Sequence, residues 1–78
     1  MVNFNAFDVV SLYIEKDTET AEHCGAGGMF QVIKVIAVIA DDNEIDITEN
    51  IDQGKFYTKS EDVAVDLGIN PKSIAFEE

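Results

Sequence analysis

The sequence predicts a small α+β domain in which one helix packs on an antiparallel sheet of about four or five strands. Three observations support this fold class. Apolar and polar residues alternate over several short stretches, as in strands that have one face in water. A later stretch has its apolar residues at helical spacing. Turn-forming residues separate these stretches. The chain has 78 residues, and this length fits one domain, so we assign residues 1–78 to it.

The first predicted strand spans residues 7–15, and a polar, then glycine-rich loop follows over residues 17–28. A single helical turn fits between Thr18 and Cys24, with Gly25 as its stop. Successive side chains of a strand point to opposite faces. The alternation therefore gives an inward set of Val10, Leu12 and Ile14, and an outward set of Val9, Ser11, Tyr13 and Glu15.

The most apolar stretch of the chain is residues 29–40, in which Gln31 and Lys34 are the polar interruptions. A continuous apolar run is typical of a strand that is covered on both faces. We therefore predict that this stretch is the central strand of the sheet.

A hairpin is expected next, because Asp41-Asp42-Asn43 is a turn signal and the following residues alternate again. The alternation over residues 44–51 places its isoleucines inward. Residues 30–51 would then form two antiparallel strands around the turn. The predicted inward residues of the second strand are Ile45, Ile47 and Ile51.

One helix is predicted after a turn at residues 52–54 and a further short strand at residues 55–58. Ser60 is the expected N-cap, and acids follow it in the first turn, where the helix dipole favours them. Gly68 is a natural stop. Residues 73–77 alternate and are compatible with an edge strand, although the sequence leaves open whether residues 70–78 are helix or strand.

The composition is strongly acidic. Sixteen residues are Asp or Glu, five are Lys and none is Arg, so the formal net charge is −11. This charge opposes direct binding to nucleic acid and to anionic membranes, and it favours basic protein surfaces. The longest apolar run is far shorter than the roughly 20 residues of a membrane-spanning helix. The lone Cys24 and the lack of a basic N-terminal stretch predict a cytoplasmic protein.

The motifs that suggest chemistry are incomplete. His23-Cys24-Gly25-Ala26-Gly27 resembles the phosphate loop of protein tyrosine phosphatases, but Phe30 stands where that loop needs arginine. The same glycines lack the Gly-Lys-Ser/Thr of a nucleotide loop. Zinc requires three or four ligands, and the acids at residues 41–46 do not follow the calcium-loop pattern. We therefore predict no catalytic residue, no cofactor and no metal site.

Residues 62–74 resemble the helix-turn-helix of bacterial transcription regulators. The resemblance rests on an alanine, the run Leu67-Gly68-Ile69, and the apolar Ile74 five residues further on. Asn70 and Pro71 would cap and open the second helix. That helix would end in Glu77-Glu78, whereas a DNA-reading helix needs basic residues. We interpret the segment as a helix and turn used for packing, with a small regulator as an alternative function.

The candidate functional residues are carboxylates in three groups. If residues 15–19 are extended, the acids at every second position lie on one face, about 6.8 Å from one another, and residues 42–46 offer a second row at that spacing. Two further acids are four residues apart on the predicted helix, the second of them at the unfavourable end of its dipole. The predicted partner-binding residues are Glu15, Asp17, Glu19, Asp42, Glu44, Asp46, Asp62 and Asp66.

In size, acidity and lack of a catalytic set, the chain resembles small phage-encoded anti-defence proteins, which include anti-CRISPR proteins and DNA mimics. The resemblance implies a non-enzymatic inhibitor that docks an acidic face on a basic groove of a nucleic-acid-binding complex in the host cytoplasm. The alternative from another class is a structural subunit that forms a homodimer or larger assembly through its apolar strand and a free sheet edge.

Overall fold

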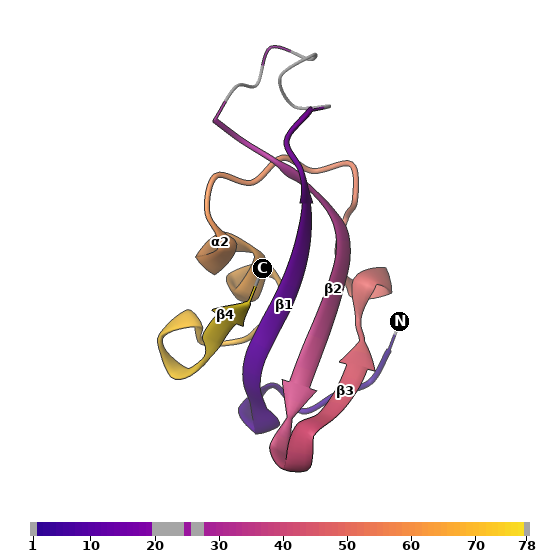
Figure 1. Ribbon diagram of the computed structural model, residues 1–78, viewed down its shortest axis with the longest axis vertical. Helices are drawn as coiled ribbons and strands as arrows, with labels where there is room; N and C mark the ends of the chain where they lie inside the picture. Colours follow the sequence, from indigo (N-terminus) through magenta and orange to yellow (C-terminus); the bar gives the residue numbers. More distant parts are fainter. Residues whose placement is uncertain (1, 20–24, 26–27, 78) are drawn as a thin grey trace.

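Two long strands, β1 (Val9–Asp17) and β2 (Gln31–Ile39), pair antiparallel at the centre of the computed structural model, which describes residues 2–19, 25 and 28–77 (Figure 1). β3 (Asn43–Asp46) pairs with β2, and β4 (Ala75–Glu77) pairs with β1, so the sheet order is β3-β2-β1-β4. α2 (Ser60–Asp66) packs on this sheet. The predicted α+β fold is therefore confirmed.

The sheet is mixed, because β4 runs parallel to β1. Ser11 lies opposite Ala75, and Tyr13 lies opposite Glu77. The edge strand that the alternating tail predicted is confirmed, but its direction differs from the purely antiparallel sheet that we expected. Three alternating residues fix which side chains share a face and carry no information on strand direction.

The hydrophobic core lies on one face of the sheet. Leu12 and Val35 are fully buried there, and α2 covers them with Val63 and Ala64. Fully burying such an aliphatic side chain contributes about 1.5–3 kcal/mol relative to leaving it exposed. The buried apolar residues form one cluster, which consists of Val9, Leu12, Ile14, Phe30, Val32, Val35, Ala37, Ile47, Ile51, Tyr57, Val63, Ala64 and Ile69.

A β-bulge at the start of β1 corrects the predicted alternation. Val9 is 4% exposed and belongs to the core, whereas Val10 is 53% exposed. The pairing of β1 with β2 shifts between Val9 and Ser11, so one extra residue is accommodated at this point. A bulge of this kind reverses the inward and outward sets on one side of it. Leu12 and Ile14 point inward and Tyr13 and Glu15 outward, as predicted.

The expectation that both faces of the central strand are covered is wrong. β2 does lie between β1 and β3, but α2 and the loops cover only one of its faces. On the other face Lys34 is exposed and Ile36 is half-buried. A second irregularity, opposite Glu15 and Lys16, leaves Ile33 46% exposed. The apolar run of β2 therefore supplies both a core and an uncovered surface.

The hairpin between β2 and β3 is confirmed, but its second strand is shorter than the predicted residues 44–51, since it ends at Asp46 and a 3₁₀ turn follows at Thr48–Asn50. Its tip contains Asp41 and Asp42, both with positive φ, at 65° and 59°. Two successive residues in this conformation are typical of the type I′ turn, whose twist matches that of the flanking strands. Asp42 belongs to this turn, and β3 begins at Asn43.

The segment between β3 and α2 forms less regular structure than predicted. The turn at residues 52–54 is confirmed by the hydrogen bond from Lys55 N–H to the Asp52 carbonyl at 3.1 Å. The strand predicted at residues 55–58 is wrong, since Tyr57 makes an isolated bridge to Phe30. Two backbone hydrogen bonds of 2.8 Å join that pair. The bridge anchors the segment beside the start of β2.

α2 ends as predicted and begins one residue earlier than predicted. Ser60 is its first residue and Lys59 its N-cap, which makes no side-chain hydrogen bond, so the expected serine cap is wrong. Gly68, at φ 77°, follows the end of the helix. Asn70 caps a single 3₁₀ turn, Pro71–Ser73, by accepting from the Lys72 N–H at 3.0 Å. This turn stands where a helix-turn-helix would have its second helix, and β4 follows it.

Candidate protein-binding surface

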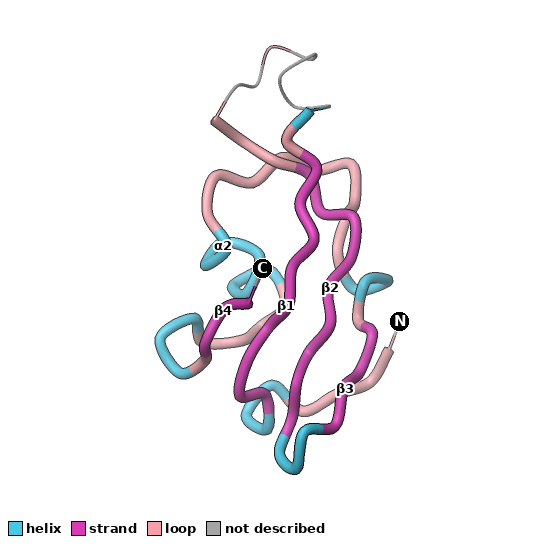
Figure 2. Tube along the Cα trace, viewed as in Figure 1, coloured by secondary structure: helices cyan, strands magenta, loops and turns pink. Residues whose placement is uncertain are grey.

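The face of the sheet opposite α2 carries side chains from all four strands, which lie side by side in Figure 2. Register places them in rows: Asp46, Ile36, Tyr13 and Glu77 are successive neighbours across the sheet. We call this surface the open face. Its residues are Tyr13, Glu15 and the buried Ser11 on β1, Lys34, Ile36 and Val38 on β2, Glu44 and Asp46 on β3, and Ala75 and Glu77 on β4.

Acids border an apolar centre on the open face. Tyr13 and Ile36 form the centre of the row and line a shallow hollow of about 280 Å³. Glu44 closes the hollow from β3, and Glu77 closes it from β4. Within this described set there are four carboxylates and one ammonium group, that of Lys34. The arrangement combines negative charge at both edges with apolar surface between them.

Asp46 is held in place by Thr48. Its Oδ1 accepts from the Thr48 backbone N–H at 3.0 Å and from the Thr48 hydroxyl at 2.6 Å. The same hydroxyl accepts from the Val35 N–H of β2 at 3.0 Å. The Thr48 hydroxyl is the main cause that lowers the pKa of the Asp46 carboxyl, and its N–H and nearby Lys34 lower it further. One carboxylate of the open face is therefore both oriented and kept ionised.

The first predicted row of acids is not continuous. Glu15 is exposed on the open face, and Asp17 is half-buried at the last position of β1. Glu19 is exposed beyond the end of the strand. The strand therefore ends before the row is complete. The helical turn predicted between Thr18 and Cys24, like the His23-Cys24 pair, falls largely on residues 20–24, which lie outside the described residues.

The second predicted row is formed in part. Glu44 and Asp46 alternate on β3 and share the open face. Their Cα atoms are about 6.8 Å apart by strand geometry. Asp42 is exposed in the turn and has left the strand. The structure thus brings three predicted residues, Glu15, Glu44 and Asp46, onto one surface.

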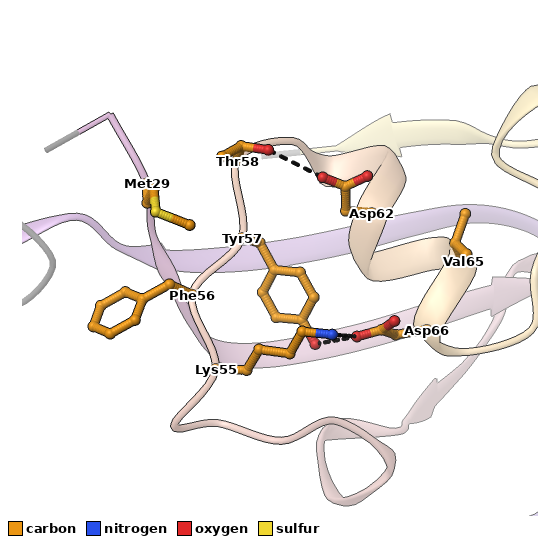
Figure 3. A pocket seen from close by; sticks show the side chains of 8 residues that line it. All are labelled: Met29, Lys55, Phe56, Tyr57, Thr58, Asp62, Val65 and Asp66. Atoms are coloured by element: carbon orange, nitrogen blue, oxygen red, sulfur yellow. Dashed lines mark hydrogen bonds and ion pairs between the residues drawn. The ribbon is translucent and has the colours of Figure 1, made fainter. Parts of the chain in front are cut away.

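The two predicted binding residues on α2, Asp62 and Asp66, lie on the other side of the sheet and have partners within the chain (Figure 3). Asp66 Oδ2 accepts from Lys55 Nζ at 2.7 Å and from the Tyr57 hydroxyl at 2.8 Å. Asp62 accepts from the Thr58 hydroxyl at 3.1 Å. No stabilising contact that offsets the position of Asp66 at the negative end of the helix dipole was visible in the sequence. Lys55 and Tyr57 supply it.

These contacts give the Asp66 site a structural role. Lys55 Nζ lies 5.2 Å from the centroid of the buried Tyr57 ring, so the ammonium group contacts both the ring and the carboxylate. Hydrogen bonds from Lys55 and Tyr57 lower the pKa of Asp66. Burial, with a contribution from Asp66, raises the pKa of Tyr57. The adjoining hollow of about 290 Å³ also has Met29, Phe56 and Val65 in its wall.

Replacing Tyr57 by Phe is expected to lower the free energy of unfolding by about 1 kcal/mol near pH 7, because Asp66 loses a donor. The lowered pKa of Asp66 means that its stabilisation is present above the unfolded pKa of about 3.9. That stabilisation is lost as the pH falls through the folded value. The cost of Tyr57→Phe should therefore shrink at about pH 3, which urea denaturation at both pH values measures.

The matched control is Thr58→Val, which removes the exposed hydroxyl contact to Asp62. Exposed polar contacts contribute little, so this change should leave stability nearly unaltered at both pH values. An equal cost of Tyr57→Phe at both pH values would contradict a role of the Asp66 charge.

Sequence reasoning missed Tyr13, Ile36 and Glu77 as parts of the candidate surface. Alternation placed Tyr13 on the wet face of its strand, so a partial signal was present. Ile36 was expected to be covered, and Glu77 joins the surface through the parallel pairing with β1. A search for acids alone could not find the apolar centre.

Two further observations complete the description of the site. Among the described residues, no group of three or more His, Cys, Asp or Glu side chains is arranged to hold a metal ion. No helix in that part of the chain has the length and apolar character to span a membrane.

Comparison of the chain with protein-family models, with curated proteins and with solved structures found no match in any of the three.

Proposed function

We propose that the protein is a non-catalytic acidic inhibitor that binds a basic groove of a nucleic-acid-binding protein or complex and occludes it. The observation that carries the proposal is the open face, on which carboxylates from three strands surround an apolar centre. Opposite charges steer association and align the partners, and the apolar centre contributes burial. The five lysines of the chain cannot neutralise its sixteen acids, so the surrounding surface adds to the same field.

The spacing of the carboxylates favours occlusion over a full imitation of DNA. Glu44 and Asp46 are about 6.8 Å apart along β3, whereas duplex DNA has one phosphate per about 3.4 Å on each strand. The open face therefore has a lower density of negative charge than a phosphate backbone. It also has an apolar centre, which a phosphate backbone lacks. In the terms of the anti-defence proteins that the chain resembles, this favours the steric blockers among the anti-CRISPR proteins. The encounter would take place in the host cytoplasm.

The test is an affinity capture from bacterial lysate with the tagged protein as bait. We expect recovery of a nucleic-acid-binding protein or complex that competing DNA or RNA displaces and that high salt releases in part. The matched control bait carries Glu44→Lys and Glu77→Lys, and it should recover much less of the same partner. A captured partner that is indifferent both to nucleic acid and to the charge reversal would contradict the proposal.

The alternative of a self-associating subunit has less support from the sheet edges. Both edge strands are short, four residues for β3 and three for β4, and both carry acids. Short, charged edges oppose pairing with another sheet. A dimer of the purified protein that persists in high salt would favour this alternative over the inhibitor.

A further inference from the structure

The open face has a width and a charge pattern that define its partner. From β3 to β4 there are three inter-strand spacings, about 14 Å in all. An α-helix with its side chains is about 10–12 Å across. A helix that lies along β1 and β2 would therefore fit between the acids of the two edge strands. Its underside would contact Tyr13 and Ile36.

From these dimensions we infer that the open face binds a cationic amphipathic α-helix of the partner protein. The apolar stripe of this helix would lie on Tyr13 and Ile36, and its flanking Lys or Arg side chains would reach Glu44 and Asp46 on one side and Glu77 on the other. This inference rests on the proposed function, since it names the part of the partner that the acidic face receives.

Charge complementarity selects this partner over the other candidates. A second copy of the chain would place acids against acids, and each copy has a net charge of −11. Nucleic acid and anionic membranes are also negative. A basic but wholly polar segment would cover Tyr13 and Ile36 without gaining the free energy of apolar contact. The amphipathic cationic helix satisfies both features of the face.

The length of the open face along β1 sets the length of the bound segment, and the apolar contacts lie at its middle row, Tyr13 and Ile36. Three rows of the open face, at Glu15, Tyr13 and Ser11, span about 14 Å along β1 at 3.4 Å per residue. A helix rises 1.5 Å per residue, so about nine or ten residues cover this distance. Apolar residues at positions i, i+3, i+4 and i+7 would then face the sheet.

Asp46 gives the face a fixed charge for such a helix. The two hydrogen bonds from Thr48 orient its carboxylate before binding. An oriented group loses less side-chain entropy when a partner arrives. Its second carboxylate oxygen, Oδ2, remains as an acceptor for a Lys or Arg of the helix.

The experiment measures the binding of two synthetic peptides to the full chain. The two peptides have the same length and the same charge as each other. One is a Leu/Lys helix with its leucines at i, i+3, i+4 and i+7, and the other has glutamine in place of every leucine. We expect the amphipathic peptide to bind at least about ten-fold more tightly. Backbone amide shifts in NMR spectra should change most at Tyr13, Ile36 and Glu44. Equal affinities, or shifts centred on α2, would overturn the inference.

Two variants locate the apolar contact. Tyr13→Ser should weaken binding of the amphipathic peptide. Val65→Ser alters an exposed apolar side chain on α2, away from the open face, and should leave that binding unchanged. Circular dichroism of each variant checks that it is folded. Equal effects of the two changes would also count against the inference.

The outcomes separate the inference from the proposed function. If both peptides bind equally and Glu44→Lys weakens both, the acidic surface works without its apolar centre, and only the inference fails. If neither peptide binds, the inference fails as well, and the lysate capture decides the proposed function independently. If the lysate capture recovers no partner while the amphipathic peptide binds at the open face, the proposed function is the one that fails.

Discussion

Replacing Leu12 by Ala is expected to lower the free energy of unfolding by about 3–4 kcal/mol. Leu12 is fully buried at the centre of β1, and Leu→Ala changes at such sites cost about 2–5 kcal/mol through lost burial and the cavity that remains. A domain of this size is stabilised by about 4–12 kcal/mol in total. Urea denaturation followed by circular dichroism should show a much lower midpoint at an unchanged slope.

The next residue along β1 provides the control. Tyr13 points to the open face and is 36% exposed, so Tyr13→Ala should cost clearly less than Leu12→Ala, about 1–2 kcal/mol. Similar costs for the two neighbours would contradict a sheet that is covered on one side only.

Reversing the charge at both borders of the open face is expected to weaken association with the captured partner by about 10- to 100-fold at low salt. Glu44→Lys and Glu77→Lys place ammonium groups opposite the basic groups of the partner. The loss should appear mainly in the association rate and should diminish as salt screens the charges. Surface plasmon resonance at several salt concentrations measures both rate constants.

A control with the same change in net charge distinguishes local from overall electrostatics. Asp8 and Glu61 are exposed, one before β1 and the other on α2, and neither belongs to the open face. Asp8→Lys with Glu61→Lys should reduce the association rate much less than the reversal on the open face. Equal reductions would mean that the net charge of −11 acts as a whole and that the open face has no special part.

Local patterns predicted the fold class and most of its elements. The alternation around Leu12, the Asp41-Asp42 turn and the stop at Gly68 each depend on neighbours in the sequence, and the structure confirms them. The bulge could not be predicted in this way. Val9 and Val10 are identical residues, so only their packing in the folded protein decides which one is buried.

The candidate surface was less predictable because long-range pairing assembles it. Glu77 reaches Tyr13 through β4, across more than sixty residues of chain. The partners of Asp66 were also hidden, since the Lys55 and Tyr57 side chains meet it only when the bridge to Phe30 positions their segment. A search for acids therefore identified charged residues of the open face but not its apolar centre.

The short parallel strand has a consequence for the dynamics of the sheet. β4 is held to β1 over three residues, so its detachment should require less free energy than global unfolding. Amides of β1 that bond to β4 would then exchange with solvent through this local opening, whereas those that bond to β2 would wait for the whole domain to unfold. When β4 detaches, Glu77 is removed from the open face. A partner that needs both acidic borders then binds only the molecules in which β4 is docked, so its apparent affinity falls in proportion to that fraction.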